Sequence, residues 1–362
     1  MKYKLLNSNK SLFLLISFIL VVKMVVLFYM FTSGNIFGGG LSDANSYHIA
    51  AIGIQEFPNA WTSILSFLND LGLYNRLGMS ICLSLLAVFV IPFIVGNLAL
   101  VNNYLQKQKV LLYLFFIVSI YPNIFLLSTD VFKDVFMLFM FLLGLYVFKS
   151  LSVVSSISLK IFLFILGLIF IYILYNFRPY LGFSYGVALM LGYFYSFKKY
   201  PLILSIVFLL LFLQVLYMFG FLDSLVNYRE GFHTVLHRNQ GSGIGISFDS
   251  SVLFIPKFIQ SFIYQMFGFY FPNFSSTVVF VFESVPFMIA LYYLIRNREY
   301  CNKFVYFLIV FFVVYATIWV IANDNLGTAS RIRIFNYIVI YIACFVVYQH
   351  KQLFKNLDIN KV

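Results

Sequence analysis

The amino-acid sequence predicts an all-α fold, a polytopic transmembrane helix bundle of about ten spans. Hydrophobic residues make up 62% of the 362 residues and charged residues only 10%, so the chain lacks the polar side chains that cover a water-soluble domain. The apolar residues recur in runs of roughly 20, the length of helix that crosses a hydrocarbon core of about 30 Å. The net charge of +12 does not indicate a nucleic-acid partner, because the basic residues gather between these runs, as in the cytoplasmic loops of membrane proteins.

Ten segments fit this length and alternate with polar connections. In chain order they are 11–32, 77–99, 110–128, 132–149, 160–177, 180–197, 201–221, 276–295, 304–322 and 334–349. The first is too long for the apolar core of a signal peptide, and no convincing cleavage site follows it, so we interpret it as a span. Basic residues in every second connection predict cytoplasmic N and C termini and large outer loops at 33–76 and 222–275. No internal repeat or linker is visible, so residues 1–362 are expected to form a single integral membrane domain.

A further apolar stretch, 252–271, is predicted to be an amphipathic helix along the outer membrane interface. If it crossed the membrane, the connections after it would change sides and the charge bias would weaken. Its polar residues instead recur at helical spacing and form one stripe. These residues are Lys257, Gln260, Ser261, Gln265 and Gly268. The shorter segment 61–68 is expected to lie in the same way.

Basic residues also occur in the predicted outer segments, where positive charge is normally scarce. They are Lys133, Arg178, Arg229, Arg238, Lys257, Arg331 and Arg333. An outward group of cations needs a reason, and the one we favour is an anionic, lipid-linked substrate held at the outer face.

The first outer loop contains Asp43, shortly after the first predicted span. A carboxylate in this place is a candidate general base toward a sugar hydroxyl. The alternative is that Asp43 only caps a helix that runs on through Tyr47.

The next short outer connection contains Asp130, Lys133 and Asp134. The two acids are four residues apart and are expected to share a helix face. We interpret both as candidate catalytic acids that align the sugar, with Lys133 on a phosphate. The alternative is a capped helix end whose charges neutralise one another.

Arginines lie at the outer ends of two predicted helices. Arg178 lies in a turn of barely two residues, which fixes it at the membrane boundary, where its planar fork suits a pyrophosphate. Arg331 and Arg333 are two residues apart, so in a regular helix they would point about 200° from each other. We expect both to reach one ligand only if the backbone after Gly327 is partly unwound. For Arg178, snorkelling of the side chain to lipid headgroups is the alternative.

The long late loop supplies Arg229, His233, His237 and Arg238 as candidate substrate or pyrophosphate contacts. The histidines have the i, i+4 spacing of a metal pair, but no glutamate completes the pattern of a zinc hydrolase. The alternating glycines that follow lack the ending of a nucleotide-binding loop, and a mobile lid is the better interpretation. No metal and no cofactor are expected.

Two charges lie deep in predicted spans, Lys23 in the first and Glu283 in the eighth. A charge at such depth costs about 2.5 to 3.5 kcal/mol or more, so each is expected to face protein and to have a partner. An ion pair between the two is the simple interpretation, and a proton or ion pathway is the alternative.

In this arrangement the chain resembles the oligosaccharide repeat-unit polymerases of bacterial surface polysaccharides, the Wzy type that makes O-antigen or capsule. The similarity covers the whole length as a layout of Phe- and Leu-rich spans, a large late outer loop and arginines at outer helix ends. It is carried by four segments: the Asp43 loop, Lys133-Asp134, Arg178-Pro179-Tyr180 and Ser330-Arg331-Ile332-Arg333. One departure concerns an arginine and a glycine that some members carry at a fixed spacing in outer loops, since Gly241 follows Arg229 at a longer distance.

The resemblance implies a GT-C-like glycosyltransferase of the bacterial inner membrane with its site on the periplasmic face. Its substrates would be a growing chain on undecaprenyl pyrophosphate and a new lipid-linked repeat unit. Membrane lipids, a flippase and a chain-length regulator are the other partners implied, and nucleic acid is not among them. The arginines would stabilise the departing pyrophosphate, and Asp43 or another outer carboxylate would take the acceptor proton.

Two other functions fit the same sequence. A GT-C enzyme that adds one sugar from a polyprenyl-phosphate donor would also use Asp43, but the pair of adjacent acids and the soluble carboxyl-terminal domain common in such enzymes are missing. A non-enzymatic flippase for lipid-linked sugar is the third possibility, although transporters often show an internal repeat and polar residues through the mid-membrane.

Overall fold

The computed structural model describes residues 2–33, 43–57, 59–102, 104–193, 201–231 and 243–359. Within these ranges every regular element is a helix, and the one β feature is an isolated bridge between Gly243 and Asn325. The all-α prediction is therefore confirmed.

Twenty helical segments follow one another within the described ranges. The amino-terminal part contains α1 (Lys2–Ser33), α2 (Asp43–Ala51), α3 (Ala60–Asp70), α4 (Arg76–Leu85), η2 (Leu86–Val90), α5 (Ile91–Leu98), α6 (Lys107–Ser119) and α7 (Pro122–Ser128). The middle part contains α8 (Lys133–Val153), α9 (Ile157–Phe177), α10 (Pro179–Tyr193), α11 (Leu202–Met218), α12 (Asp223–Glu230) and α13 (Phe254–Met266). The last part contains α14 (Phe274–Val279), η4 (Phe280–Ser284), α15 (Val285–Arg296), η5 (Arg298–Tyr300), α16 (Lys303–Ala322) and α17 (Leu326–Ile359).

Seven of the described helices are long and apolar enough to cross a membrane, or nine if each of two bent pairs counts as one span. The seven are Asn9–Ser33, Arg76–Leu98, Lys133–Val153, Ile157–Phe177, Phe274–Arg296, Lys303–Ala322 and Leu326–Asn356. The bent pairs are α6 with α7, at 64°, and α11 with α12, at 81°. The remaining predicted segment, 180–197, begins with α10, whose described part has 15 residues. The chain is thus a multi-pass membrane protein.

Two of the long helices contain a wide turn just before a proline. η2 precedes Pro92 and η4 precedes Pro286, and both are π-helical. Proline has no backbone N–H to donate, and its ring collides with the carbonyl one turn earlier. A π turn at that point opens the helix and lets it continue, so Arg76–Leu98 and Phe274–Arg296 each remain one long helix.

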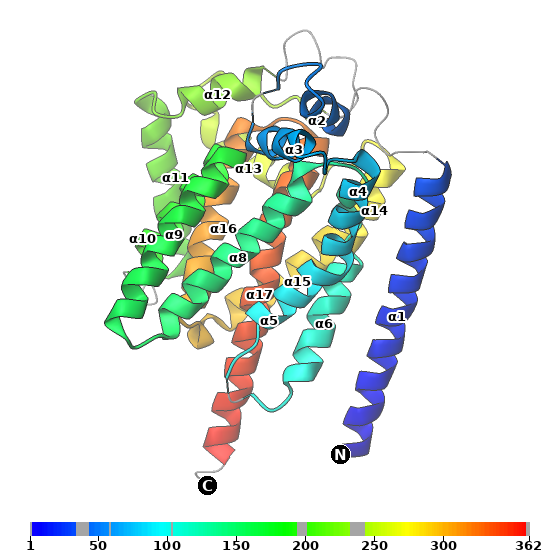
Figure 1. Cartoon of the computed structure of the whole chain (residues 1–362). Coiled ribbons are helices and arrows are strands. Elements are labelled where there is room, and N and C mark those ends of the chain that lie inside the picture. The colour runs from blue at the N-terminus through cyan, green and yellow to red at the C-terminus, as the bar shows by residue number, and fades with distance from the viewer. Residues whose placement is uncertain are drawn as a thin grey trace.

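The core of the bundle lies around α16 and α17, and α17 is the most enclosed of the candidate spans, with 83% of its apolar window buried. Rings interlock along both helices, for example Phe141 with Phe311, 4.7 Å apart, and Phe287 stacked on Tyr337, 4.0 Å apart. Figure 1 shows α17 passing through the middle of the bundle, while α1 stands at its edge and is only 11% buried. Both termini lie at one end of the bundle, and α2, α3 and α12 lie at the other.

The predicted interfacial stretch contains α13, a helix of 13 residues. Its polar stripe does not face a headgroup layer as a whole, because Ser261 and Gln265 are fully buried. Gln265 donates to the carbonyl oxygens of Val320 and Asn323, at 3.3 and 2.8 Å. Part of the stripe is thus polar because it donates hydrogen bonds to the carbonyl oxygens at the end of α16.

Candidate functional site

Arg331, in the second turn of α17, joins two carboxylates from distant parts of the chain. Its Nη1 donates to Oδ2 of Asp43 at 2.6 Å, and its Nη2 donates to Oδ2 of Asp134 at 2.7 Å. Asp43 begins α2 and Asp134 lies in the first turn of α8. The planar guanidinium suits this bridge because its two terminal nitrogens point to different partners from one rigid group.

Arg178 reaches the same carboxylate from the turn between α9 and α10, and its Nη2 lies 3.4 Å from Oδ1 of Asp134. The turn is tight because α10 crosses close over α9 at Gly182. A Cβ atom on Gly182 would lie 2.4 Å from the backbone nitrogen of Tyr175 and 2.7 Å from the carbonyl oxygen of Ile171. Only glycine permits this close approach of the two helices. The approach fixes the position of the Arg178 backbone in the turn.

Lys133 completes a cluster of five charged residues. Its Nζ donates to the carbonyl oxygen of Phe177 at 3.3 Å, beside Arg178. We call Asp43, Lys133, Asp134, Arg178 and Arg331 the Arg331 cluster. Three cations and two carboxylates leave it a net charge of +1 (3 − 2).

Some hydrogen-bonding capacity of the cluster is unused. Nε of Arg331 is buried and donates no hydrogen bond to any described residue, and Nη1 of Arg178 is buried with the Tyr315 hydroxyl near its guanidinium. A buried charged donor without a partner is costly, so these nitrogens favour an added anion. The excess positive charge favours the same kind of ligand.

The two carboxylates of the cluster differ in access. The side chain of Asp43 is 52% exposed, whereas that of Asp134 is 2% exposed and lies between two arginines. A general base must reach the hydroxyl it deprotonates. Asp43 meets this requirement, and Asp134 is placed to hold the arginines.

Aromatic residues that the sequence analysis did not assign enclose the cluster. The Arg331 guanidinium lies 5.4 Å from the centre of the Phe132 ring, and that of Arg178 lies 5.6 Å from Tyr180. Tyr47, in α2, is 3% exposed, and burial followed by the charges of Asp134 and Asp43 raises its phenol pKa well above the usual value. No local motif marks these rings among so many other aromatic residues.

Asp130 lies outside this cluster, contrary to the prediction that it shares a helix face with Asp134. The backbone at Phe132 is extended, with φ −68° and ψ 137°, and α8 begins only at Lys133. Asp130 therefore belongs to the preceding turn, where it pairs with Arg76 through hydrogen bonds of 2.9 and 2.6 Å. Its carboxylate is fully buried and already accepts hydrogen bonds from Arg76.

Arg229 is also outside the cluster, and its environment is that of a structural residue. It is fully buried in α12 and forms an ion pair with Asp324. It also donates to the carbonyl oxygens of Ile246, Val320 and Asn323, at 2.6, 2.9 and 2.5 Å. Arg229 thus satisfies the end of α16 and the turn into α17, in place of the predicted contact with substrate.

Arg333 points away from Arg331, because α17 stays a regular helix through both residues and the expected unwinding does not occur. Its Nη2 lies 3.5 Å from Oε2 of Glu283, and both side chains are at most 2% exposed. Glu283 also accepts from the backbone and side-chain nitrogens of Asn123, both at 3.0 Å. Glu283 therefore pairs with Arg333 and not with Lys23, whose Nζ lies 4.8 Å from the ring centre of Phe125.

The other candidate contacts of the long loop, His233, His237 and Arg238, lie outside the described residues. The structure thus brings together Asp43, Lys133, Asp134, Arg178 and Arg331 and places Asp130, Arg229 and Arg333 in separate ion pairs.

The cluster combines three cations with one accessible carboxylate. Such a pair of features can neutralise an anionic leaving group and accept a proton from a nearby hydroxyl. Comparison with known proteins adds no further information, since no family model, no curated protein and no solved structure matches this chain.

Proposed function

We propose that this protein polymerises lipid-linked oligosaccharide repeat units in the synthesis of a bacterial surface polysaccharide, O-antigen or capsule. The donor would be a growing chain on undecaprenyl pyrophosphate, and the acceptor a single lipid-linked repeat unit. The protein would act in the bacterial inner membrane with the Arg331 cluster on the periplasmic side.

The observation that carries the proposal is the meeting of four distant segments at Arg331. Asp43 and Arg331 are 288 residues apart, yet their side chains are 2.6 Å apart. Lys133-Asp134 and Arg178 supply the other members. These are the segments on which the resemblance to repeat-unit polymerases depends.

The proposed reaction is a displacement at the anomeric carbon of the donor. The acceptor hydroxyl oxygen forms a bond to that carbon, and its proton passes to the Asp43 carboxylate. The bond from the anomeric carbon to the pyrophosphate oxygen breaks, and the electron pair stays on the pyrophosphate. Arg331, Arg178 and Lys133 stabilise the charge that develops there.

The ion pair between Arg331 and Asp43 fits this sequence of events. The Asp43 oxygen occupies a place at Nη1 of Arg331 that a phosphate oxygen can take. Phosphate binding would then release Asp43 from Arg331 and free the carboxylate to act as a base. Breaking this ion pair costs little free energy, because Asp43 is half exposed and water solvates its carboxylate after release.

Deletion of the gene in its host tests the proposal. A polymerase predicts surface polysaccharide that carries single repeat units in place of the normal ladder on a gel. Repeats that lack one sugar would instead identify an enzyme that adds a single residue, and loss of all surface repeats would identify a flippase. Either of these two results would refute the proposed function.

A further inference from the structure

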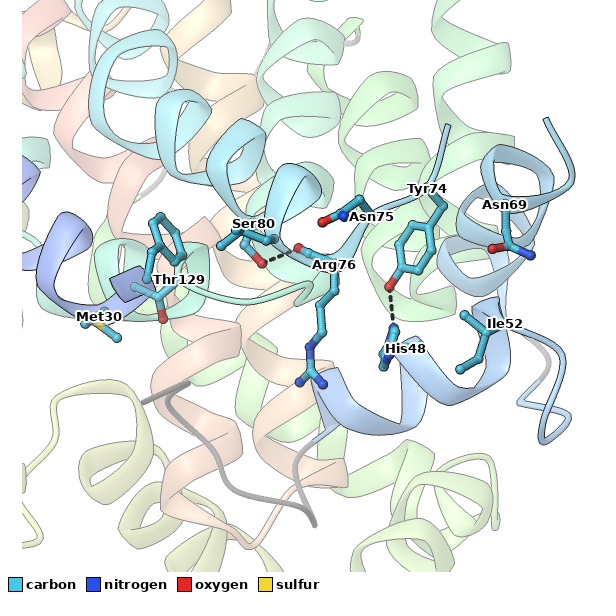
Figure 2. A pocket seen from close by; sticks show the side chains of 11 residues that line it. Met30, His48, Ile52, Asn69, Tyr74, Asn75, Arg76, Ser80 and Thr129 are labelled. Atoms are coloured by element: carbon cyan, nitrogen blue, oxygen red, sulfur yellow. Dashed lines mark hydrogen bonds between the residues drawn. The ribbon is translucent and has the colours of Figure 1, made fainter. Parts of the chain in front are cut away.

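A cavity of about 480 Å³ lies beside the Arg331 cluster, between the end of α1, the helix α2 and the start of α4. Its volume is within the range of roughly 300 to 1,000 Å³ found for small-molecule sites. The lining residues that matter for a ligand are Met30, Phe31, His48, Ile52, Tyr74 and Arg76. Figure 2 shows Met30 and Thr129 toward one side of the cavity and Ile52 and Asn69 toward the other.

The polar part of this wall has hydrogen-bonding groups but no excess charge. Arg76 is neutralised by the buried Asp130, and its Nη1 donates to Oδ1 of Asn45 at 3.2 Å. Nδ1 of His48 lies 3.0 Å from the hydroxyl of Tyr74, as the dashed line in Figure 2 marks. This wall suits neutral hydroxyl groups, in contrast to the Arg331 cluster with its net charge of +1.

Another part of the wall is apolar and comes from α1. Met30 and Phe31 of its last turn line the cavity there. α1 is the least enclosed of the candidate spans. A ligand in this cavity therefore meets polar groups on one side and a lipid-contacting helix on the other.

The helix α2 connects the cavity to the cluster. Asp43 begins α2, and His48 follows five residues later. Five residues of α-helix rise about 7.5 Å and turn through about 140°, so these two side chains lie on different faces of α2. Arg76 lies between the two faces, because it lines the cavity and its Nη1 donates to Asn45, two residues after Asp43. A sugar chain that extends from the cavity past Arg76 to the start of α2 can therefore bring a hydroxyl to the Asp43 carboxylate.

We infer that this cavity binds the sugar part of the acceptor, as an uncharged polyhydroxylated ligand whose pyrophosphate and lipid lie outside the cavity. The inference rests on the proposed function and divides the two substrates between two places. The donor pyrophosphate binds the Arg331 cluster, and the acceptor sugar binds the cavity lined by His48, Tyr74 and Arg76.

The test uses the full-length protein in lipid nanodiscs and the free repeat oligosaccharide, released by mild acid from the lipid-linked repeats of a host that lacks this gene. This probe has neither phosphate nor lipid, so it reports on the sugar site alone. The blocking variant is Ile52→Trp, which fills the cavity without changing a charge. The matched control is Ile54→Trp, because Ile54 is 72% exposed and does not line the cavity.

The expected result is that Ile52→Trp weakens oligosaccharide binding by roughly tenfold or more, while Ile54→Trp and Arg331→Ala leave the dissociation constant unchanged. Tyr74→Phe, which removes one hydroxyl with little change in shape, is expected to weaken binding to a smaller extent. Equal binding to wild type and Ile52→Trp, or no binding to wild type, would overturn the inference.

Polymer formation separates this inference from the proposed function. If Ile52→Trp builds polymer as fast as wild type, the cavity is not the acceptor site and the polymerase proposal stands. If wild type binds the oligosaccharide but forms no new glycosidic bond with lipid-linked donor and acceptor, the polymerase proposal fails.

Discussion

Replacement of Asp134 by asparagine is expected to destabilise the protein far more than the same change at Asp43. The Asp134 carboxylate is 2% exposed and accepts from Arg331 at 2.7 Å and lies 3.4 Å from Arg178. Asparagine keeps the shape but turns an N–H₂ group toward one arginine, so two donors face each other. It also raises the net charge of the Arg331 cluster from +1 to +2.

The size of the effect follows from burial. Removal of one partner from a buried ion pair costs about 3 to 5 kcal/mol, because the other charge stays behind without compensation. Asp43 contacts the same arginine at 2.6 Å, but its side chain is 52% exposed, and an exposed pair contributes only about 0 to 1 kcal/mol. Asp134→Asn is therefore expected to lose at least about 2 kcal/mol more than Asp43→Asn.

The assay is reversible unfolding of the purified variants in mixed micelles by added dodecyl sulfate, followed by far-ultraviolet circular dichroism. Arg298→Ala is the control for handling of the variants, since Arg298 is exposed and belongs to η5. Equal free energies of unfolding for Asp134→Asn and Asp43→Asn would refute the assignment of Asp134 as the buried carboxylate that holds both arginines.

Three further changes test separate parts of the structure. Gly182→Ala is expected to destabilise the α9–α10 turn and to reduce polymer formation, because its Cβ would meet a backbone atom at 2.4 Å. The control is Gly186→Ala, whose Cβ would meet only a side chain, at 3.3 Å. This control is expected to behave like wild type in the same unfolding and product assays. Glu283→Gln leaves the Arg333 charge unpaired and is expected to cost about 3 to 5 kcal/mol in unfolding free energy; further replacement of Arg333 by methionine should restore part of it, and no recovery would contradict the pairing. The pKa of His48 lies below its ordinary value of 6.5, mainly because of burial and then because of the positive charge of Arg76. The folded state thus prefers neutral His48, so this contribution to stability is present above 6.5 and is lost as pH falls through the folded pKa. Wild type should lose more unfolding free energy than His48→Gln between about pH 7.5 and about pH 5.5, and a smaller loss would contradict this assignment.

The helical fold could be predicted because membrane spans are defined by length and hydropathy, which are local properties of the sequence. Length and hydropathy do not predict the extended backbone at the residue before Lys133 or the bend at Pro122. The segment 110–128 was predicted as one span, yet α6 and α7 meet at 64°. Hydropathy does not report this break, because residues on both sides of it are apolar.

The members of the site could be named from the sequence only in part, since ion pairing depends on tertiary contacts. The sequence marks Arg178 and Arg331 as cations at helix ends, but no local pattern indicates that one carboxylate, Asp134, lies between them. Arg229 and Arg333 carried the same local signal and are buried in structural pairs. The rotation of α17 about its axis determines which arginine joins the cluster, because Arg331 faces α2 and α8 whereas Arg333 faces Glu283.

The most direct test of the polymerase proposal is product formation by the purified protein in liposomes that contain lipid-linked repeat units. The account predicts a ladder of products that increase by one repeat unit, formed by wild type and by Arg298→Ala. Arg331→Ala is expected to slow the reaction by roughly 10²- to 10³-fold, the effect of removing one group that stabilises a developing anion. A ladder formed by Arg331→Ala at the wild-type rate, or the absence of any ladder with wild type, would contradict the account.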